Sequence, residues 1–311
     1  MNGNEASAPL KVLVPGDLGL DLSDTAANID AVLYTPGEPW PSGQLDAAAV
    51  VVGYANAAAV GAGFAELPNL RLVQTLNAGY EQWLPLLPAG VMLSNGRGAH
   101  GGSSAEWVVA ALLAIYRELG LFAQQQGDGQ WHRKDTETLI GKRVVVLGAG
   151  DLAVSLAARL APFETDVALV GRQARPGVHA MDEVEGLLPN ADVVVAMLPE
   201  SEATHHIVDA GFLARLPDGA IVVNVGRGGL VDTEALLAEL NSGRLRAALD
   251  VTDPEPLPPG HPLWSAPGLL LTPHVAGSTE GAWERAWAVA QIQLEAYASG
   301  AKPPNLVAGP D

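Results

Sequence analysis

The stretch Val144-Val-Val-Leu-Gly-Ala-Gly-Asp-Leu-Ala153 decides the fold of this chain. Its four leading apolar residues predict a buried strand, and the glycines that follow predict a tight turn into a helix. Gly148 permits the turn, Gly150 leaves no side chain between the backbone and a bound pyrophosphate, and Ala153 lets the helix pack closely on the strand. The first N–H groups of a helix lack intrahelical partners and attract phosphates. The stretch therefore predicts a dinucleotide site.

On both sides of this stretch, apolar runs alternate with helical segments, which is typical of parallel sheets with crossover helices. Strands are expected at 11–15, 47–53, 70–76, 91–94, 143–147, 166–170, 192–198, 220–225, 245–251 and 269–272. Helices are expected at 108–118, 153–160, 233–240 and 283–297. Because the strand runs are continuously apolar, both faces of each sheet are expected to be covered.

Length and breaks in the pattern indicate two lobes. A chain of 311 residues suits about two domains, since domains commonly contain roughly 100–200 residues. Ser103 and Glu106 have the spacing of a capping box and predict the start of the helix that includes 108–118. The segment 127–131 breaks the helical pattern and is a candidate connection between the lobes.

Charge and residue usage argue against several classes of function. The formal net charge is −18, which disfavours nucleic acid and anionic membranes as partners because both require clustered Lys and Arg. The chain has no Cys, so a disulfide framework, a thiolate nucleophile and a Cys-ligated zinc site are excluded. Residues 1–9 are polar, and no apolar run reaches the ~18 residues of a membrane span. We therefore expect a cytoplasmic protein without a signal peptide.

The end of the next strand bears on which dinucleotide is bound. About 20 residues after the glycines, an acidic residue would bind the ribose hydroxyls of NAD. This chain has Arg172 and Arg175 there instead. Two guanidinium groups suit a 2′-phosphate, which they bind through charge-assisted hydrogen bonds. The sequence therefore favours NADP over NAD, the alternative being that both arginines are solvated loop charges.

Three later strands end in ionisable side chains: Arg227, Glu255 and His274. In an open parallel sheet, ligands bind outside the carboxyl ends of the strands, so we expect these side chains to converge. An arginine can hold a carboxylate in a bidentate way. A histidine can donate a proton near neutral pH, and a carboxylate can orient its imidazole. Reduction of a 2-keto acid requires these groups.

The order of these segments resembles the D-isomer-specific 2-hydroxyacid dehydrogenase family, of the glyoxylate/hydroxypyruvate reductase type. The resemblance covers most of the chain. It rests on Ala191-Asp-Val-Val194, Asn224-Val-Gly-Arg-Gly228, Leu249-Asp-Val251, Pro254-Glu-Pro256, Thr272-Pro-His-Val-Ala-Gly277, Asn77-Ala-Gly79 and Ala105-Glu-Trp107. It implies that hydride moves between a nicotinamide and a small 2-keto or 2-hydroxy acid. Arg227 would bind and polarise the substrate, Glu255 would pair with the imidazole, and His274 would be the general acid/base.

The resemblance also implies further binding residues. Asn77, Ala78 and Gly79 would form the substrate loop, where backbone N–H groups of Ala78 and Gly79 would hold the carboxylate. Asp250 would lie near the nicotinamide. The other residues expected to contact the cofactor are Asp151, Leu152, Leu198, Pro199, Val225 and Gly277.

The fold that the resemblance implies is α/β, with two Rossmann-like, doubly wound parallel-sheet lobes. The dinucleotide-binding lobe, 97–282, would be inserted into the substrate lobe, 1–96 and 283–311. The helix 283–297 would then return to the substrate lobe. A homodimer is also implied, through the helix after Ser103 and its neighbours.

Two departures from the family pattern leave alternatives open. The two arginines put NAD in doubt, and Tyr80 is larger than the aliphatic residues that mostly follow Asn77-Ala-Gly79 in the family. One alternative function is a dinucleotide-sensing binding module, like the related co-repressors; the complete set of Arg227, Glu255 and His274 counts against it. A dehydrogenase of a phosphorylated hydroxy acid ranks lower, because the N-terminal lobe offers no obvious additional residues that would bind a phosphate group. The sequence names neither the keto acid nor the physiological direction.

Overall fold

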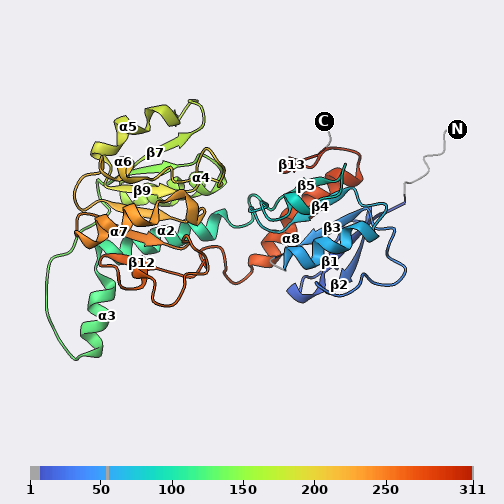
Figure 1. Ribbon diagram of the computed structural model, residues 1–311, viewed down its shortest axis with the longest axis horizontal. Coiled ribbons are helices and arrows are strands. Elements are labelled where there is room, and N and C mark those ends of the chain that lie inside the picture. The colour runs from blue at the N-terminus through green and yellow to red at the C-terminus, as the bar shows by residue number, and fades with distance from the viewer. Residues whose placement is uncertain (1–7, 54–55, 310–311) are drawn as a thin grey trace. The chain divides into compact units, whose positions relative to one another are not determined.

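The computed structural model describes residues 8–53 and 56–309, and the chain divides into two compact α/β units (Figure 1). Unit 1 comprises Met1–His100 and Glu280–Asp311, and unit 2 comprises Gly101–Thr279. Unit 2 is therefore inserted into unit 1, which confirms the expected fold class. Residues 1–7, on which the signal-peptide prediction largely rests, lie outside the described residues. None of the described helices is both long enough and apolar enough to cross a membrane.

Unit 1 contains a six-stranded sheet in the order β13-β5-β4-β3-β1-β2. Its strands are β1 (Leu10–Pro15), β2 (Ile29–Tyr34), β3 (Ala49–Val52), β4 (Leu72–Thr75), β5 (Met92–Ser94) and β13 (Leu306–Ala308). All pairs are parallel except β13 with β5. The sequence analysis missed β2 and β13, which are the two edge strands. An edge strand is only partly covered: β2 is interrupted by the exposed Asp30, and β13 is only three residues long, so neither gave a strong strand signal.

Both faces of this sheet are buried, as its apolar runs predicted. Successive residues of a strand point to opposite faces. Val12 and Val14 belong to the core that includes α8 (Ala282–Ala298). Leu13, between them, belongs to the core that includes α1 (Ala57–Ala62). Helix α8 follows the return of the chain from unit 2. It therefore covers a sheet whose last parallel strand, β5, ends almost 200 residues before it in the sequence.

Unit 2 contains a seven-stranded, all-parallel sheet in the order β12-β11-β10-β9-β6-β7-β8. Its strands are β6 (Arg143–Leu147), β7 (Asp166–Gly171), β8 (Val178–Ala180), β9 (Val193–Ala196), β10 (Ile221–Asn224), β11 (Arg246–Leu249) and β12 (Leu269–Leu271). The strand order runs one way from β6 through β7 and the other way from β6 through β9. A topological switch point therefore lies between β6 and β9, where open α/β sheets bind ligands at the carboxyl ends of their strands.

Helices cover both faces of the unit 2 sheet. They are α2 (Gly101–Tyr116), α4 (Asp151–Leu160), α5 (Val184–Leu187), α6 (Ala210–Leu213) and α7 (Thr233–Asn241), whereas α3 (Leu119–Gly127) follows α2 and has no buried residue. Helices α2 and α4 share one apolar core with Val144 and Val146. Helices α6 and α7 share the other core with Val145 and Leu147. The strand that leads into the glycine turn is thus packed from both sides.

Two expectations about the start of unit 2 are wrong. Helix α2 begins at Gly101, so Ser103 and Glu106 lie inside the helix and do not form a capping box at its start. A Cβ at Gly101 would lie against the carboxylate of Asp151, the first residue of α4, so the start of α2 packs closely on the start of α4. The segment 127–131 also does not connect the units: it follows α3 within unit 2, and the chain passes between units at His100 and Thr279.

Candidate active site

The turn from β6 to α4 has the backbone that a dinucleotide site needs. Gly148 has a φ of +131°, which favours glycine, and a Cβ there would lie 2.9 Å from the Met197 carbonyl oxygen at the end of β9. Gly150 is the residue before α4 and provides no side-chain cap. A Cβ at Gly150 would meet no atom within 4 Å, so the space beside it is open. Ala153 is buried, as close packing of α4 on the sheet requires. An uncapped helix end that faces open space fits a phosphate group.

The other predicted cofactor residues lie at the ends of neighbouring strands. Leu198 and Pro199 follow β9, and Val225 follows β10. A Cβ at Gly226 would lie 2.9 Å from the Leu198 carbonyl oxygen, so the turns after these two strands pack directly on each other. Leu152, in the first turn of α4, is half-buried. The structure thus groups these residues around the carboxyl edge of the sheet.

The two arginines after β7 lie beside the glycine turn. Both are exposed. Arg175 Nη2 donates a hydrogen bond of 2.9 Å to the carbonyl oxygen of Ala149, within the turn. Arg172 makes no hydrogen bond or ion pair with any residue that the structure describes. One guanidinium is therefore tied to the glycine turn, while the other is available to a ligand.

His274 and Glu255 form a short hydrogen bond. Nδ1 of His274 lies 2.6 Å from Oε1 of Glu255, and the two side chains are 41% and 40% exposed. Since an ionised carboxylate can only accept, Nδ1 carries the proton. This bond fixes the orientation of the ring and leaves Nε2 for an exchangeable proton. The structure confirms that the loop after β11 brings a carboxylate to the histidine after β12.

The backbone that carries His274 is held by the buried carboxylate of Asp250. Oδ1 of Asp250 accepts hydrogen bonds from the Thr272 hydroxyl (2.5 Å) and the Val275 N–H (2.8 Å), and Oδ2 accepts from the Ala276 N–H (2.8 Å). The Asp250 carbonyl also accepts from the N–H of His274 (2.7 Å). His274 has a φ of +55°, a left-handed conformation that non-glycine residues rarely adopt. The described contacts of Asp250 are therefore those of a residue that shapes the histidine turn, which leads on to Gly277.

The turn that carries Arg227 is shaped in a similar way by buried Asn224. Its Nδ2 donates to the carbonyl oxygen of Arg227 (2.8 Å), and its Oδ1 accepts from the N–H of Gly226 (3.1 Å). Arg227 is half-buried, and its Nη1 donates to the Gly226 carbonyl (2.8 Å). A side chain at Gly228 would collide with the Thr252 carbonyl, so this turn packs tightly on the loop after β11. The sequence analysis quoted Asn224 within a motif but missed its positioning role.

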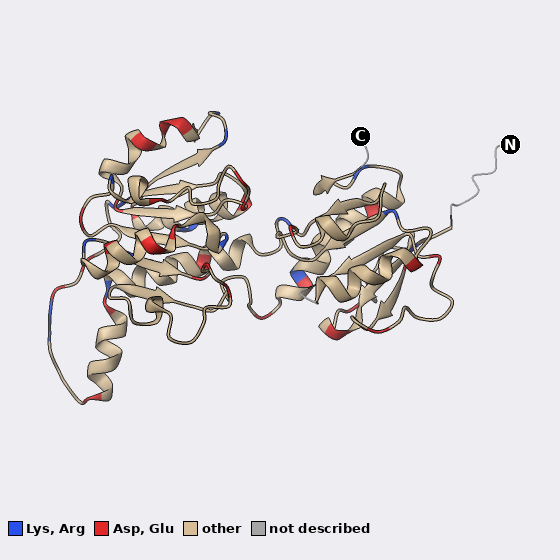
Figure 2. Cartoon of the chain, in the orientation of Figure 1, with Lys and Arg blue, Asp and Glu red and all other residues tan. Residues whose placement is uncertain are grey.

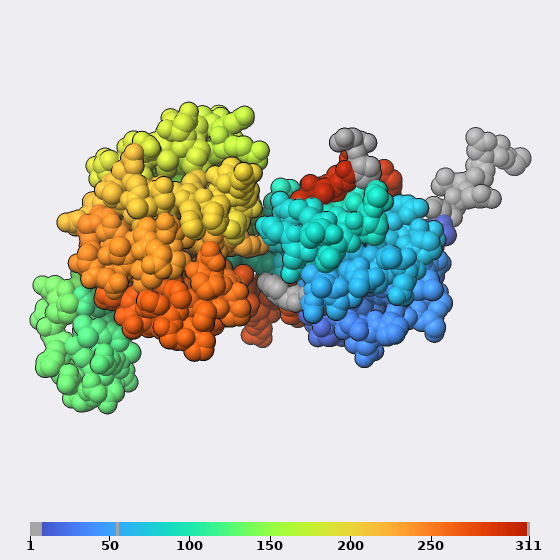
Figure 3. All heavy atoms as spheres, in the orientation of Figure 1, coloured from blue at the N-terminus to red at the C-terminus, as the bar shows by residue number. Residues whose placement is uncertain are grey.

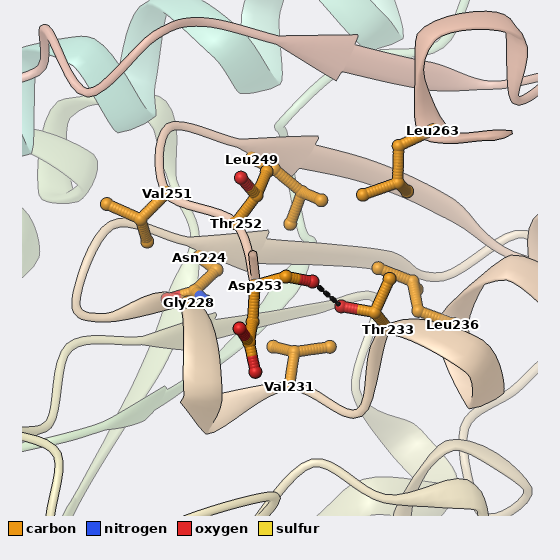
Figure 4. A pocket seen from close by; sticks show the side chains of 10 residues that line it. All are labelled: Asn224, Gly228, Val231, Thr233, Leu236, Leu249, Val251, Thr252, Asp253 and Leu263. Carbon is orange, nitrogen blue, oxygen red and sulfur yellow. Dashed lines mark hydrogen bonds between the residues drawn. The ribbon is translucent and has the colours of Figure 1, made fainter. Parts of the chain in front are cut away.

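A small cavity lies between the turn after β10 and the loop after β11 (Figure 4). It is lined by residues at the ends of β10 and β11 and on α7, and the Thr233 hydroxyl donates to the Asp253 carbonyl across it (2.9 Å). Its volume of about 10 Å³ is room for about one water molecule. It is therefore a packing feature that supports the turns and not the site of a dinucleotide.

The predicted substrate loop lies in unit 1, after β4. Asn77 is buried, Ala78 is exposed and Gly79 is half-buried. The following Tyr80 is half-buried and packs against the core of unit 1. The large side chain at that position thus contributes to packing within the unit. Among the described residues, no group of three or more His, Asp or Glu side chains is arranged to bind a metal ion.

Comparison with known proteins identifies the family. The model of the D-isomer specific 2-hydroxyacid dehydrogenase NAD-binding domain matches residues 109–276. A protein described as an uncharacterized protein in the proB 3′ region of Corynebacterium melassecola is 36% identical over 235 residues, which are 70% of this chain and 75% of that protein. The glyoxylate reductase of Thermofilum pendens is 30% identical over 255 residues, which are 77% of this chain and 75% of that enzyme.

A solved structure agrees over nearly the whole chain. The D-isomer specific 2-hydroxyacid dehydrogenase of Xanthobacter autotrophicus, crystallised with NADPH and MES, has a TM-score of 0.79 at 30% identity. The match covers 95% of this chain and 98% of that one. The resemblance seen in the sequence is therefore confirmed, and the chain belongs to the D-isomer specific 2-hydroxyacid dehydrogenase family.

Proposed function

We propose that this protein is a nicotinamide-dependent oxidoreductase that reduces small 2-keto acids to 2-hydroxy acids, and catalyses the reverse reaction when product and oxidised cofactor dominate. The observation that carries the proposal is the hydrogen bond between His274 and Glu255, located at the same edge of the sheet as the glycine turn. A sensor of dinucleotides has no need of an oriented imidazole. A reductase needs one to protonate the carbonyl oxygen of its substrate.

The three side chains at the strand ends divide the chemistry among them. The nicotinamide, when bound, supplies or accepts the hydride. Arg227 holds the substrate and polarises its carbonyl through its planar, permanently charged guanidinium. His274 donates the proton of Nε2 to the oxygen at C2 during reduction and removes it during oxidation. Glu255 accepts the hydrogen bond from Nδ1 and so keeps the ring oriented with Nε2 as the atom that exchanges the proton.

The two units have different roles in this proposal. Unit 2 corresponds to the dinucleotide-binding lobe expected at 97–282. The uncapped start of α4, with Gly148 and Gly150, would hold the pyrophosphate. Unit 1 corresponds to the substrate lobe expected at 1–96 and 283–311. Backbone N–H groups of its loop at Asn77–Gly79 would bind the substrate carboxylate.

NADP is the preferred cofactor in this proposal. Arg172 is exposed beside the glycine turn, and Arg175 is anchored to that turn. The segment from Arg172 to Arg175 contains no Asp or Glu, so no carboxylate at this strand end would repel a 2′-phosphate. The similar Xanthobacter structure contains NADPH, which supports the same choice.

Asp250 acts in this proposal as a positioning residue for His274. Its two carboxylate oxygens are engaged by the Thr272 hydroxyl and by the N–H groups of Val275 and Ala276. A carboxylate that already accepts three hydrogen bonds has little capacity left for the nicotinamide. Its contribution to catalysis would therefore come mainly through the imidazole, and less through contact with the cofactor.

The sequence placed a homodimer at the helix after Ser103, which is α2, and its neighbours; among these neighbours we propose α3 and the segment 128–134, here called the arm, as the contact surface. Helix α3 has no buried residue, and Trp131 is 95% exposed. A hollow of about 680 Å³ lies between α3 and this segment, and Figure 3 shows the arm projecting from the body of unit 2 in green. A nine-residue helix is too short to be stable without packing, since isolated helices below roughly 12–15 residues are marginal in water.

Charge supports a second copy of the chain as the partner of the arm. The segment His132-Arg-Lys134 is a local concentration of basic residues in a chain of net charge −18. Figure 2 shows acidic residues distributed over both units. Lys134 pairs with Glu118 (2.7 Å), so Arg133 is the arm's cation for the acidic surface of another copy, while the exposed tryptophan supplies apolar area.

Replacing His274 with Gln should abolish efficient turnover. Gln keeps a polar side chain but cannot donate a proton as an acid, so kcat with glyoxylate and NADPH should fall by about 10²–10⁴-fold. The Kd of NADPH, measured by fluorescence titration, should stay close to the wild-type value. His261→Gln, at a histidine away from the strand-end site, should retain activity. Undiminished turnover by the His274 variant would show that another group provides the proton.

Arg172→Gln should weaken NADPH selectively. Loss of a charge-assisted bond to the 2′-phosphate should raise the KM of NADPH by about 10-fold, with little change for NADH. Arg143→Gln makes the same charge change at the opposite end of β6 and should leave both values unaltered. Steady-state kinetics with both cofactors checks this, and equal effects on NADPH and NADH would contradict the assignment.

Asp250→Asn should lower kcat more than it alters cofactor affinity. The carboxylate of Asp250 accepts hydrogen bonds from the N–H groups of Val275 and Ala276. In the variant, the amide NH₂ group would face one of these donors, which should destabilise the turn by about 1.5–3 kcal/mol. We expect kcat to fall and its pH profile to shift, while the KM of NADPH changes little. Asp232→Asn is the control, because Asn caps a helix as well as Asp does. A variant that mainly raised the KM of NADPH would instead support direct contact with the nicotinamide.

Trp131→Glu should dissociate the dimer. A charge in place of an apolar anchor should raise the dimer Kd by about 30-fold or more, because hot-spot residues contribute at least ~2 kcal/mol to binding. Sedimentation equilibrium measures this directly. Trp264→Glu alters a second exposed tryptophan of unit 2 (57% exposed) and should leave the dimer intact. A monomeric wild-type protein would refute the proposed assembly.

A further inference from the structure

The substrate loop of unit 1 is shaped by hydrogen bonds to its carbonyl groups. The carbonyl oxygen of Asn77 accepts from the Gly96 N–H (2.8 Å) and from the Thr75 hydroxyl (2.5 Å). The carbonyl oxygen of Ala78 accepts from Nδ2 of Asn95 (2.8 Å). Two consecutive carbonyl groups are therefore held by partners at the ends of β4 and β5, with two of the three donors in the segment after β5.

Fixing these carbonyls also fixes the N–H groups that follow them. The peptide bonds of the loop are trans, and in a trans peptide the C=O and the next N–H point in opposite directions. The N–H groups of Ala78 and Gly79 are therefore both directed away from the partners of the carbonyls. Among the described residues, neither donates to a protein acceptor, and Ala78 is exposed. Two successive backbone N–H groups without a protein acceptor are available to donate to an anion.

Asn95 is itself held by the segment that precedes β13. The N–H of Asn95 donates to the Asn305 carbonyl (3.2 Å), and Nδ2 of Asn305 donates to the carbonyls of Asn95 (3.1 Å) and Arg97 (2.9 Å). The N–H of Asn305 donates in turn to Oε1 of Gln293 on α8 (2.7 Å). The loop is thus connected through three amide side chains to the last helix and last strand of the chain.

Burial makes this amide chain rigid. Asn95, Asn305 and Gln293 are only 8%, 9% and 3% exposed. A buried amide without partners costs on the order of 1–3 kcal/mol, so each of these side chains is strongly favoured in the one orientation that satisfies it. A side chain at Gly96 would collide with the Leu76 carbonyl, so the segments after β4 and β5 approach as closely as glycine permits. The two N–H groups are therefore oriented before any ligand binds.

We propose that Asn95, supported by Asn305 and Gln293, is a positioning residue that presets the N–H groups of Ala78 and Gly79 for one planar carboxylate. The identity of that carboxylate as part of a 2-keto acid rests on the proposed function. The position of the N–H groups does not. Because the bonds to the carboxylate are alike in the substrate and the transition state, losing them raises KM and leaves kcat nearly unchanged.

Asn95→Asp tests the proposal with an isosteric change. The new carboxylate cannot donate to the Ala78 carbonyl, although it can still accept from the Arg97 N–H as Oδ1 of Asn95 does (3.2 Å). We expect the KM of glyoxylate to rise by about 10-fold or more, with kcat and the KM of NADPH within about 3-fold of wild type. Asn28→Asp is the matched control, at an exposed asparagine of the same unit.

Thr75→Val tests the same N–H groups from the Asn77 carbonyl without adding a charge. It removes one of the two donors to that carbonyl, so it should raise the KM of glyoxylate in the same direction, by about 3–10-fold. Thr35→Val, at an exposed threonine, is its control. Thermal unfolding of all four variants checks folding, and if Asn95→Asp does not fold, Thr75→Val decides the outcome.

Calorimetric titration with oxalate, a carboxylate that accepts no hydride, separates this inference from the proposed reaction. Binding by the wild type that is about 10-fold weaker in Asn95→Asp supports the positioning role, even if no keto acid is reduced and the proposed reaction fails. Wild-type values of oxalate affinity and glyoxylate KM in both variants would overturn it. A wild-type protein that does not bind oxalate would also overturn it.

Discussion

The parallel pairing of β6 with β7 on one side and β9 on the other is the constraint on which unit 2 depends. Parallel strands all end at the same edge of a sheet, so each loop after a strand begins at that edge. The glycine turn after β6 and the turns that carry Arg227, Glu255 and His274 share it for this reason. The strand order reverses at β6: the chain first builds the sheet toward β7 and β8, and then returns to build it from β9 to β12 on the other side of β6. The connections on the two sides of β6 therefore diverge, which leaves the edge open to a ligand.

A second feature recurs in both units: a functional group or its turn is oriented by a buried polar side chain. Asp250 holds the turn of His274, and Asn224 holds the turn of Arg227. Asn95 holds the carbonyl of Ala78. Hydrogen bonds are stronger in a low dielectric, so a buried partner fixes geometry better than a solvated one. Groups that are oriented before the substrate arrives do not lose conformational entropy during catalysis.

Because the chain is strongly acidic, the local groups that bind anions are especially important. With a net charge of −18, the protein as a whole repels anionic cofactors and substrates. Binding must then come from short-range donors: the start of α4, the guanidinium groups of Arg172 and Arg227, and the backbone N–H groups of Ala78 and Gly79. Backbone donors and helix ends have the advantage that they bind anions without requiring further Lys or Arg.

The sequence by itself determined the features that depend on neighbouring residues. The glycine turn follows from the identity of Gly148 and Gly150, and the buried strands follow from continuous apolar runs. The chemical groups at strand ends were readable because a strand and the loop after it are contiguous. The pairing of His274 with Glu255 was predicted correctly, since it required only that two neighbouring strands be parallel.

Only the tertiary structure decided features that depend on distant contacts. Edge strand β2 is interrupted by Asp30 and edge strand β13 has only three residues, so they are strands mainly because a neighbour supplies their hydrogen bonds. Helix α2 begins at Gly101, whose backbone lies against Asp151, 50 residues later, and not at the capping pattern of Ser103. Asn95 and Asn305 are 210 residues apart in sequence yet share hydrogen bonds. Hydrogen bonding and burial depend on distance in space, which the linear order of residues does not record.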